Sequence, residues 1–218
     1  MRRFKVTPMV ISVVYPGIDH ARFFPQKKAD IQAFKKRSGI KNKYILFVGT
    51  FEPRKNLTTL IKAYVGLPDK LRSQYTLVLA GSRGWKNFLA DRLLAKYEGE
   101  DIVDLGFVSD QDLPTVYSGA SIFVFPSVFE GFGMPVIEAM ACGTPVIAAK
   151  NSSLVEACGK AGLLFKTKDS ADLRKKMTKV LSSANTRKSM RSKGIKHAKQ
   201  FSWKNSAAEL EKVFSKYE

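Results

Sequence analysis

Residues 123–149 read FVFPSVFEGFGMPVIEAMACGTPVIAA, and the alternation of elements in this stretch decides the fold. The run from Ile122 to Phe125 is short, apolar and rich in β-favouring residues, so it predicts a buried strand. The segment from Pro126 to Gly133 holds one proline and two glycines, which continue neither a strand nor a helix. Pro135 suits the first position of a helix, where its missing N–H costs nothing. The order is therefore strand, loop, helix.

The same stretch leads into a second buried strand. The helix is expected to end at Gly143, and Thr144 to Ala149 is again an apolar, strand-like run. Further strands are predicted at Tyr44–Val48, Thr76–Ala80, Ile102–Leu105 and Gly162–Phe165, with helical segments between them. This alternation predicts an α/β fold with a Rossmann-like, doubly wound parallel sheet, followed by extra helices at the C-terminus. In such sheets, a loop like 126–133 lies where ligands bind.

The residues of this loop suit a phosphate between two hydroxyl-binding groups. Gly131 and Gly133 lack side chains and let the backbone approach a ligand closely. The free N–H groups at the start of the helix favour an anion such as phosphate. Glu130 in the loop and Glu138, which we expect in the first helical turn, are carboxylates that can accept hydrogen bonds from sugar hydroxyls. A nucleotide sugar combines these groups. The alternative is that Glu138 only complements the helix dipole while Glu130 is a solvated loop acid.

The string EGFGMPVIEAMACGTPVIA closely resembles the nucleotide-binding half of retaining glycosyltransferases with the GT-B fold, of the group 1 or family-4 type. The resemblance implies that Glu138 holds the ribose of the donor and that Glu130 contacts the donor sugar. It also implies a donor-binding backbone segment. Its residues are Gly131, Phe132, Gly133, Met134 and Pro135.

A second motif, GTFEPRKNL at residues 49–57, follows the strand Tyr44–Val48. Arg54 and Lys55 precede a helix that Asn56 is expected to cap. This motif also resembles the family, which implies that Lys55, helped by Arg54, neutralises the departing diphosphate, with Gly49 in the donor site. It is not a Walker A loop, because the second glycine and the following Ser/Thr are missing. A solvated basic loop is the alternative reading.

Two further expectations follow from the resemblance. The loop from Gly106 to Asp110 should line the base pocket, with Val108 in it. The strand candidate Val10–Tyr15 should mark the passage from an acceptor-binding domain, so that the chain begins at this passage and the acceptor-binding half, or a partner subunit, is missing. We accordingly divide the chain into a basic linker (1–43), which includes a helix from Gln26 to Ser38, a donor-binding domain (44–200) and a terminal helix (201–218) that packs toward the absent domain.

The chain carries a net charge of +18, which is concentrated at its two ends. Residues 1–43 have a net charge of +9 and residues 166–218 of +10, whereas the middle of the chain has −1. Such a charge favours anionic partners, including an anionic membrane surface, although solvated helix faces explain it equally well. No nucleic-acid-binding motif is present, so nucleic acid is not expected as a partner.

Other features favour a cytoplasmic protein, with peripheral contact to the membrane as an option. The N-terminus lacks the apolar stretch of a signal peptide, and no segment approaches the roughly 20 apolar residues of a transmembrane helix. The two cysteines, Cys142 and Cys158, make no disulfide framework. The two histidines, His20 and His197, are expected at the surface, and no metal is expected.

Together these observations favour a hexosyltransferase that uses a GDP- or UDP-sugar and acts on a glycan or lipid-linked acceptor, with mannose as the favoured hexose. Catalysis would rest on Glu130, Lys55 and Arg54, with no nucleophile from the protein and no cofactor beyond the donor. A stand-alone nucleotide-sugar-binding module is the alternative. A GT-B epimerase or phosphorylase is a third reading. A phosphorylase would need a cofactor-bound lysine whose sequence context is not found, and an epimerase would need catalytic acids partly supplied by the absent domain.

Overall fold

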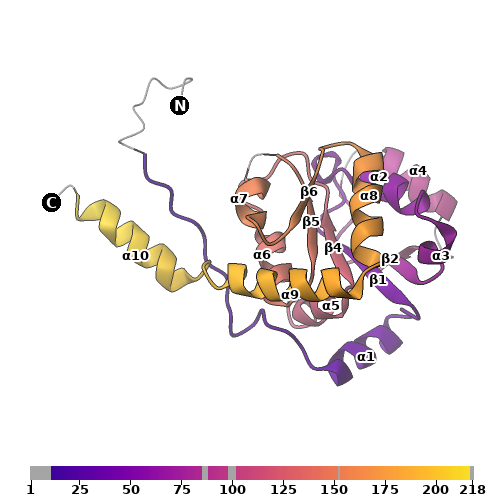
Figure 1. Cartoon of the computed structure of the whole chain (residues 1–218), viewed down its shortest axis with the longest axis horizontal. Coiled ribbons are helices and arrows are strands. Elements are labelled where there is room, and N and C mark those ends of the chain that lie inside the picture. The colour runs from indigo at the N-terminus through magenta and orange to yellow at the C-terminus, as the bar shows by residue number, and fades with distance from the viewer. Residues whose placement is uncertain (1–10, 85–87, 98–101, 152, 217–218) are drawn as a thin grey trace.

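The computed structural model describes residues 11–84, 88–97, 102–151 and 153–216. Within these residues, six parallel strands form one sheet in the order β3-β2-β1-β4-β5-β6 (Figure 1). The strands are β1 (Lys43–Val48), β2 (Tyr75–Ala80), β3 (Ile102–Asp104), β4 (Ile122–Phe125), β5 (Val146–Ala149) and β6 (Leu163–Phe165). This is the Rossmann order, and the predicted fold class is confirmed.

The sheet reverses its direction of growth between β1 and β4. The chain adds β2 and β3 on one side of β1 and then returns to pair β4 with the other side, through Ile45 with Ile122 and Leu46 with Phe123. The loops that leave β1 and β4 therefore start side by side, at the carboxyl ends of adjacent parallel strands. Ligands of doubly wound sheets bind at this switch point.

Helices cover both faces of the sheet (Figure 1). α2 contacts both α4 and α8 on one side, while α5, α6 and α7 form a contacting series on the other, where α9 packs on α6. The helices are α1 (Lys28–Arg37), η2 (Pro53–Lys55), α2 (Leu57–Val65), α3 (Asp69–Arg72), α4 (Phe88–Tyr97), α5 (Leu113–Gly119), α6 (Met134–Ala141), α7 (Leu154–Cys158), α8 (Ser170–Leu181), α9 (Ala184–Ala198) and α10 (Trp203–Phe214).

The strands form because their residues are apolar on both faces. All four residues of β4 and all four of β5 are buried, as expected for strands of a parallel sheet covered on both sides. The predicted strand at Val10–Tyr15 is wrong for its described part, since residues 11–15 have no strand partner and Val13 is 65% exposed. Val10, the first residue of this predicted strand, lies outside the described residues.

The terminal helix α10 extends away from the sheet (Figure 1). Ser202 caps it by accepting a hydrogen bond from the N–H of Asn205. Its apolar side chains are exposed, including Leu210 (45%) and Phe214 (62%). The N-terminal segment reaches the start of this helix through a bridge between Ile18 and Ser202. Among the described residues, no helix is long and apolar enough to cross a membrane.

Candidate functional site

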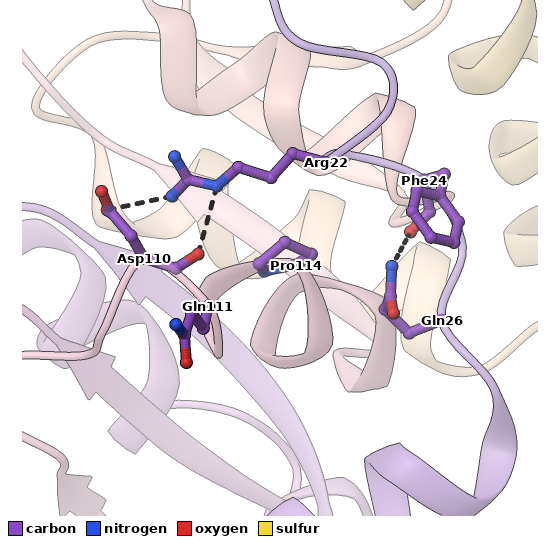
Figure 2. A pocket seen from close by; sticks show the side chains of 6 residues that line it. All are labelled: Arg22, Phe24, Gln26, Asp110, Gln111 and Pro114. Atoms are coloured by element: carbon purple, nitrogen blue, oxygen red, sulfur yellow. Dashed lines mark hydrogen bonds and ion pairs between the residues drawn. The ribbon is translucent and has the colours of Figure 1, made fainter.

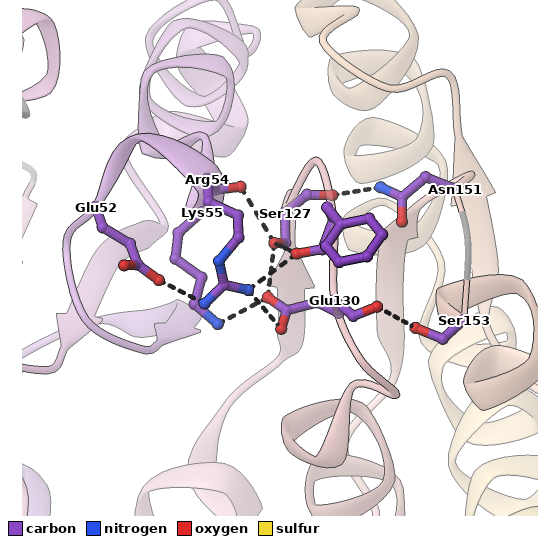
Figure 3. Close-up of polar contacts among 8 residues, drawn as sticks. Glu52, Arg54, Lys55, Ser127, Glu130, Asn151 and Ser153 are labelled. Carbon is purple, nitrogen blue, oxygen red and sulfur yellow. Dashed lines mark hydrogen bonds and ion pairs between the residues drawn. The ribbon is translucent and has the colours of Figure 1, made fainter.

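The loops that leave β1 and β4 meet in a cluster of charged side chains (Figure 3). Lys55 Nζ lies 2.7 Å from Glu130 Oε1, and an Arg54 guanidinium nitrogen lies 2.7 Å from Glu130 Oε2. Arg54 also pairs with Glu52 at 2.5 Å. The structure thus brings together Lys55, Arg54 and Glu130, although 75 residues separate Lys55 from Glu130.

The cluster is held by local geometry on both sides. Lys55 ends the short helix η2, and its ammonium lies 5.0 Å from the centre of the Phe125 ring. The lysine stem passes over Gly49, where a Cβ would come within 3.6 Å of the Lys55 Cε. Asn56 was expected to cap α2 with its side chain, and this is wrong. Its backbone is left-handed, and its amide donates to the carbonyl of Pro126, which ties the two loops together.

Sequence reasoning missed Ser127, which is buried and supports Glu130. The Ser127 hydroxyl donates to Glu130 Oε1 at 2.6 Å, and the Ser127 carbonyl accepts a hydrogen bond from the Asn151 amide. The backbone carbonyl of Glu130 accepts from the Ser153 hydroxyl at 2.9 Å (Figure 3). Ser127 lies in the loop after β4, three residues before Glu130, whereas Asn151 and Ser153 lie in the loop before α7 and reach the motif only through the tertiary fold.

Glu130 remains ionised in this setting. Burial opposes the charge, but hydrogen bonds from Lys55 and Ser127, the charge of Lys55 and a hydrogen bond from Arg54 outweigh it and lower the pKa of Glu130 below its usual value. A carboxylate offers about four lone-pair positions. Lys55 and Ser127 occupy Oε1, and Arg54 occupies one position of Oε2. One position on Oε2 is left for a ligand.

The glycine-containing loop turns sharply into α6. Gly133 is the N-cap, with a left-handed φ of 105°, and a Cβ there would lie 2.5 Å from the Leu154 side chain. Met134 is the first helical residue of α6. Pro135 therefore takes the second helical position, whereas the sequence predicted it in the first. Gly131 is exposed, so the backbone before Phe132 is accessible, whereas Gly133 after it is buried.

Phe132 itself points into an aromatic group rather than into solvent. Its ring centroid lies 5.4 Å from that of Tyr15 and 5.4 Å from that of Phe201. The ring of Phe201 in turn packs edge-on against His197. The loop is therefore anchored to the segments that enter and leave the sheet domain.

Glu138 lies in the second turn of α6, not in the first turn as expected. This position is too far from the helix start for the dipole alone to explain it. The hydroxyl of the buried Tyr117 donates to Glu138 Oε2 at 3.0 Å. Burial is the main influence on this carboxyl and raises the pKa of Glu138, while the Tyr117 bond acts in the opposite direction. Sequence reasoning did not find Tyr117.

A cavity of about 320 Å³ is lined by Arg22, Phe24, Gln26, Asp110, Gln111 and Pro114 (Figure 2). Arg22 pairs with Asp110 at 2.9 Å, and the charges of both residues act on the pKa of Glu138. Asp110 belongs to the loop between β3 and α5, which also carries the half-buried Val108. The described hydrogen bonds and ion pairs do not join Val108 to Glu130 or Glu138.

The same loop contains an Asp-x-Asp pattern, Asp110-Gln111-Asp112, that our expectation of a metal-free site did not take into account. Both carboxylates have cationic partners, because Asp110 pairs with Arg22 and Asp112 pairs with Arg37. Across the part of the chain that the structure describes, no three His, Cys, Asp or Glu side chains come together in a group that could hold a metal ion.

Comparison with known proteins identifies the family of this chain. A family model described as "Glycosyl transferases group 1" matches residues 29–197. The chain belongs to this glycosyltransferase family. It is 41% identical over 163 residues to "O-antigen chain mannosyltransferase B" of Escherichia coli, a match that covers 74% of this chain and 43% of that protein.

Solved structures agree with the family. Sucrose-phosphate synthase from Thermosynechococcus elongatus superposes with a TM-score of 0.81 at 27% identity, covering 94% of this chain and 52% of that one. The C-terminal domain of a group 1 glycosyl transferase from Francisella tularensis gives 0.70 at 25% identity, covering 84% and 97%. The fold is thus that of GT-B glycosyltransferases, and the chain spans less than half of the mannosyltransferase that it matches.

Proposed function

We propose that this chain is the donor-binding domain of a retaining glycosyltransferase, which transfers a hexose from a nucleotide sugar to a glycan or glycolipid hydroxyl. The observation that carries the proposal is the Lys55–Glu130–Arg54 cluster at the switch point of the sheet, beside the start of α6. Two cations and a helix N-terminus at one edge of the sheet suit a diphosphate.

The cations stabilise the charge that develops on the departing nucleoside diphosphate. Glu130 holds the head groups of Lys55 and Arg54 at 2.7 Å, so these groups need little reorganisation when the bond to the sugar breaks. Lys55 retains donor N–H groups that do not face Glu130, since an ammonium has three. The N–H groups at residues 132–136 add partial positive charge on the other side of the phosphates.

The two carboxylates bind hydroxyl groups. Glu130 has one free lone-pair position and accepts one hydroxyl of the donor sugar. Glu138 is fixed by Tyr117 through Oε2, which leaves Oε1 for the ribose. The loop of Val108 and Asp110 approaches the base, near the cavity of Figure 2. No side chain is assigned as a nucleophile. Retention of the anomeric configuration then requires the acceptor hydroxyl to attack the face that the leaving group vacates, with its proton passing to an oxygen of the departing diphosphate.

Mannose is the favoured sugar because several relatives are mannosyltransferases, including "Serotype-specific mannosyltransferase WbdA" of Escherichia coli at 34% identity. The acceptor would be a glycan or lipid-linked glycan, bound with the help of a second GT-B domain. The proposed location is the cytoplasm or the cytoplasmic face of the membrane. No metal is assigned to the reaction.

The first test is a thermal-shift panel of UDP, GDP and ADP and their sugar conjugates. A ligand at 100 times its Kd adds about 2.7 kcal/mol of stability. For a chain of this size the expected rise in Tm is about 5–10 °C. We expect one base to give this rise and Glu138→Gln to abolish most of it, because two hydroxyl bonds to a carboxylate are worth about 3–6 kcal/mol.

A matched control is available on α7. Glu156 also accepts a hydrogen bond from a tyrosine, Tyr15, at 2.8 Å. Glu156→Gln should leave the nucleotide response unchanged. The 2′,3′-dideoxy form of the same nucleotide should bind the wild type as weakly as the ribonucleotide binds Glu138→Gln. Equal responses of wild type and Glu138→Gln to the ribonucleotide would remove the ribose role, and no response to any nucleotide would refute the proposed donor site.

A further inference from the structure

A basic groove is lined by residues of α9, by the turn that follows α7, and by Gln200 just after α9. Its volume is about 340 Å³, and its lining consists of Lys160, Ala161, Lys193, Lys196, His197 and Gln200. Three ammonium groups and a side-chain amide therefore surround one cavity that contains no carboxylate. None of these residues belongs to the Lys55–Glu130–Arg54 cluster.

The backbone brings these like charges together. Gly159 has a left-handed φ of 48°, and a Cβ there would lie 2.6 Å from the His197 ring. The His197 Nε2–H donates to the carbonyl of Ala157 at 2.9 Å, which fixes the imidazole against the end of α7. The turn is thus held close to α9, and Lys160 lines the same groove as Lys193 and Lys196.

The charge of the groove is not compensated by neighbouring acids. Residues 173–208 contain eleven Lys and Arg and no Asp or Glu. Arg187 and Arg191 in this run donate to backbone carbonyls, of Val180 and Gly143 respectively. Among the described residues, neither Lys160, Lys193 nor Lys196 has a hydrogen-bond or ion-pair partner. Three like charges that converge without a counter-charge destabilise the fold unless an anion binds among them.

We propose that this groove is an anion site that binds a phosphate group, carried by the headgroup of an anionic phospholipid or by a soluble phosphate. Lysine ammonium groups bind phosphate as point charges, and several of them around one cavity can share its oxygens. The groove is open to solvent, which suits a group presented from a membrane surface as well as a free ion. This site shares no residue with the Lys55–Glu130–Arg54 cluster, where the nucleotide is proposed to bind.

The test compares Lys193→Ala/Lys196→Ala with a control pair, Lys179→Ala/Lys188→Ala. All four lysines are exposed, and both pairs lower the net charge by two, but the control pair does not line the groove. One arm titrates inorganic phosphate and follows Tm. The other measures co-sedimentation with phosphatidylcholine vesicles, with and without phosphatidylglycerol. Without ligand, the groove pair should keep or raise Tm, since it relieves repulsion, and this establishes that the variant folds.

We expect the groove pair to weaken phosphate binding about tenfold or more. If the phosphate comes from lipid, the groove pair should also weaken binding to phosphatidylglycerol vesicles. The expected loss is roughly 30-fold, which is the combined contribution of two lysines to binding at an anionic surface. A phosphate response without vesicle binding assigns the site to a soluble phosphate. Equal losses in both pairs would mean diffuse charge rather than a site, and a wild type that binds neither probe overturns the proposal.

Discussion

The buried ion pair between Lys55 and Glu130 should contribute far more to stability than an exposed pair of the same length. Lys55 and Glu130 are 2.7 Å apart with side chains each 11% exposed, whereas Lys212 and Glu209 are 2.7 Å apart with side chains 67% and 56% exposed. In Glu130→Gln the shape is kept and the charge is lost. Removing one partner of a buried pair costs about 3–5 kcal/mol. The glutamine oxygen can still accept from Lys55, so we expect the lower end, about 3 kcal/mol.

For a chain of 218 residues, that loss corresponds to a fall in Tm of about 6–12 °C. Glu209→Gln, the matched control, should cost no more than about 0.5 kcal/mol. Both values can be measured by urea unfolding and calorimetry. Similar losses in the two variants would show that burial does not strengthen the Glu130 cluster and would refute the reasoning.

The pH dependence of the unfolding free energy provides a second, independent test of the Glu130 charge. The folded-state pKa of Glu130 lies below its usual value of 4.5. Its contribution to stability is therefore fully present above the unfolded-state pKa and is lost as the pH falls through the folded-state pKa. The difference in unfolding free energy between wild type and Glu130→Gln should be constant near neutral pH and shrink in acid. A difference that grows on acidification would contradict the assignment of the charge to Glu130.

Three further outcomes follow from the structure. Burial raises the pKa of Glu138, so its charge costs stability at pH values above its unfolded-state pKa. Glu138→Gln should therefore be more stable than wild type at pH 7 and lose this advantage in acid, which urea unfolding at several pH values would test. Gly133→Ala places a Cβ 2.5 Å from Leu154 at a φ of 105° and should lose about 1–3 kcal/mol, measurable as a lower Tm. Burial raises the pKa of Cys142 and of Cys158 to about 12, so neither thiol should react with a thiol reagent at pH 8 until the chain unfolds.

The sheet could be predicted from the sequence because each strand carries its own signal. β4 and β5 are short runs of residues that are buried on both faces, and such runs are readable without knowledge of their neighbours. The segment at Val10–Tyr15 carries a similar composition, yet residues 11–15 form no strand, because composition does not tell whether a partner strand is present. The exact start of α6 was misplaced by one residue because Met134 adopts helical geometry before Pro135.

The cluster of Lys55, Arg54 and Glu130 was only partly predictable. Lys55, Arg54 and Glu130 belong to motifs that stand out in the sequence, and the switch point explains why they meet. Ser127 and Tyr117 carry no such signal, because a serine at a strand end and a tyrosine in a helix are common residues with many uses. Their roles depend on contacts across 3 and 21 positions of sequence, which only the packed structure defines.

The two carboxylates of the central motif lie eight residues apart but in opposite electrostatic settings. Around Glu130, cations and a hydroxyl outweigh burial and keep the carboxylate charged, whereas around Glu138 burial outweighs a single tyrosine bond. Glu130 therefore gains its partners from the protein and can serve as a fixed anchor for Lys55 and Arg54 before any ligand arrives. Glu138 lacks such compensation, and hydroxyl groups of a bound ribose would supply the hydrogen bonds that stabilise its charge. An uncompensated carboxylate costs folding energy, and that energy is recovered on binding only if the ligand brings the missing donors.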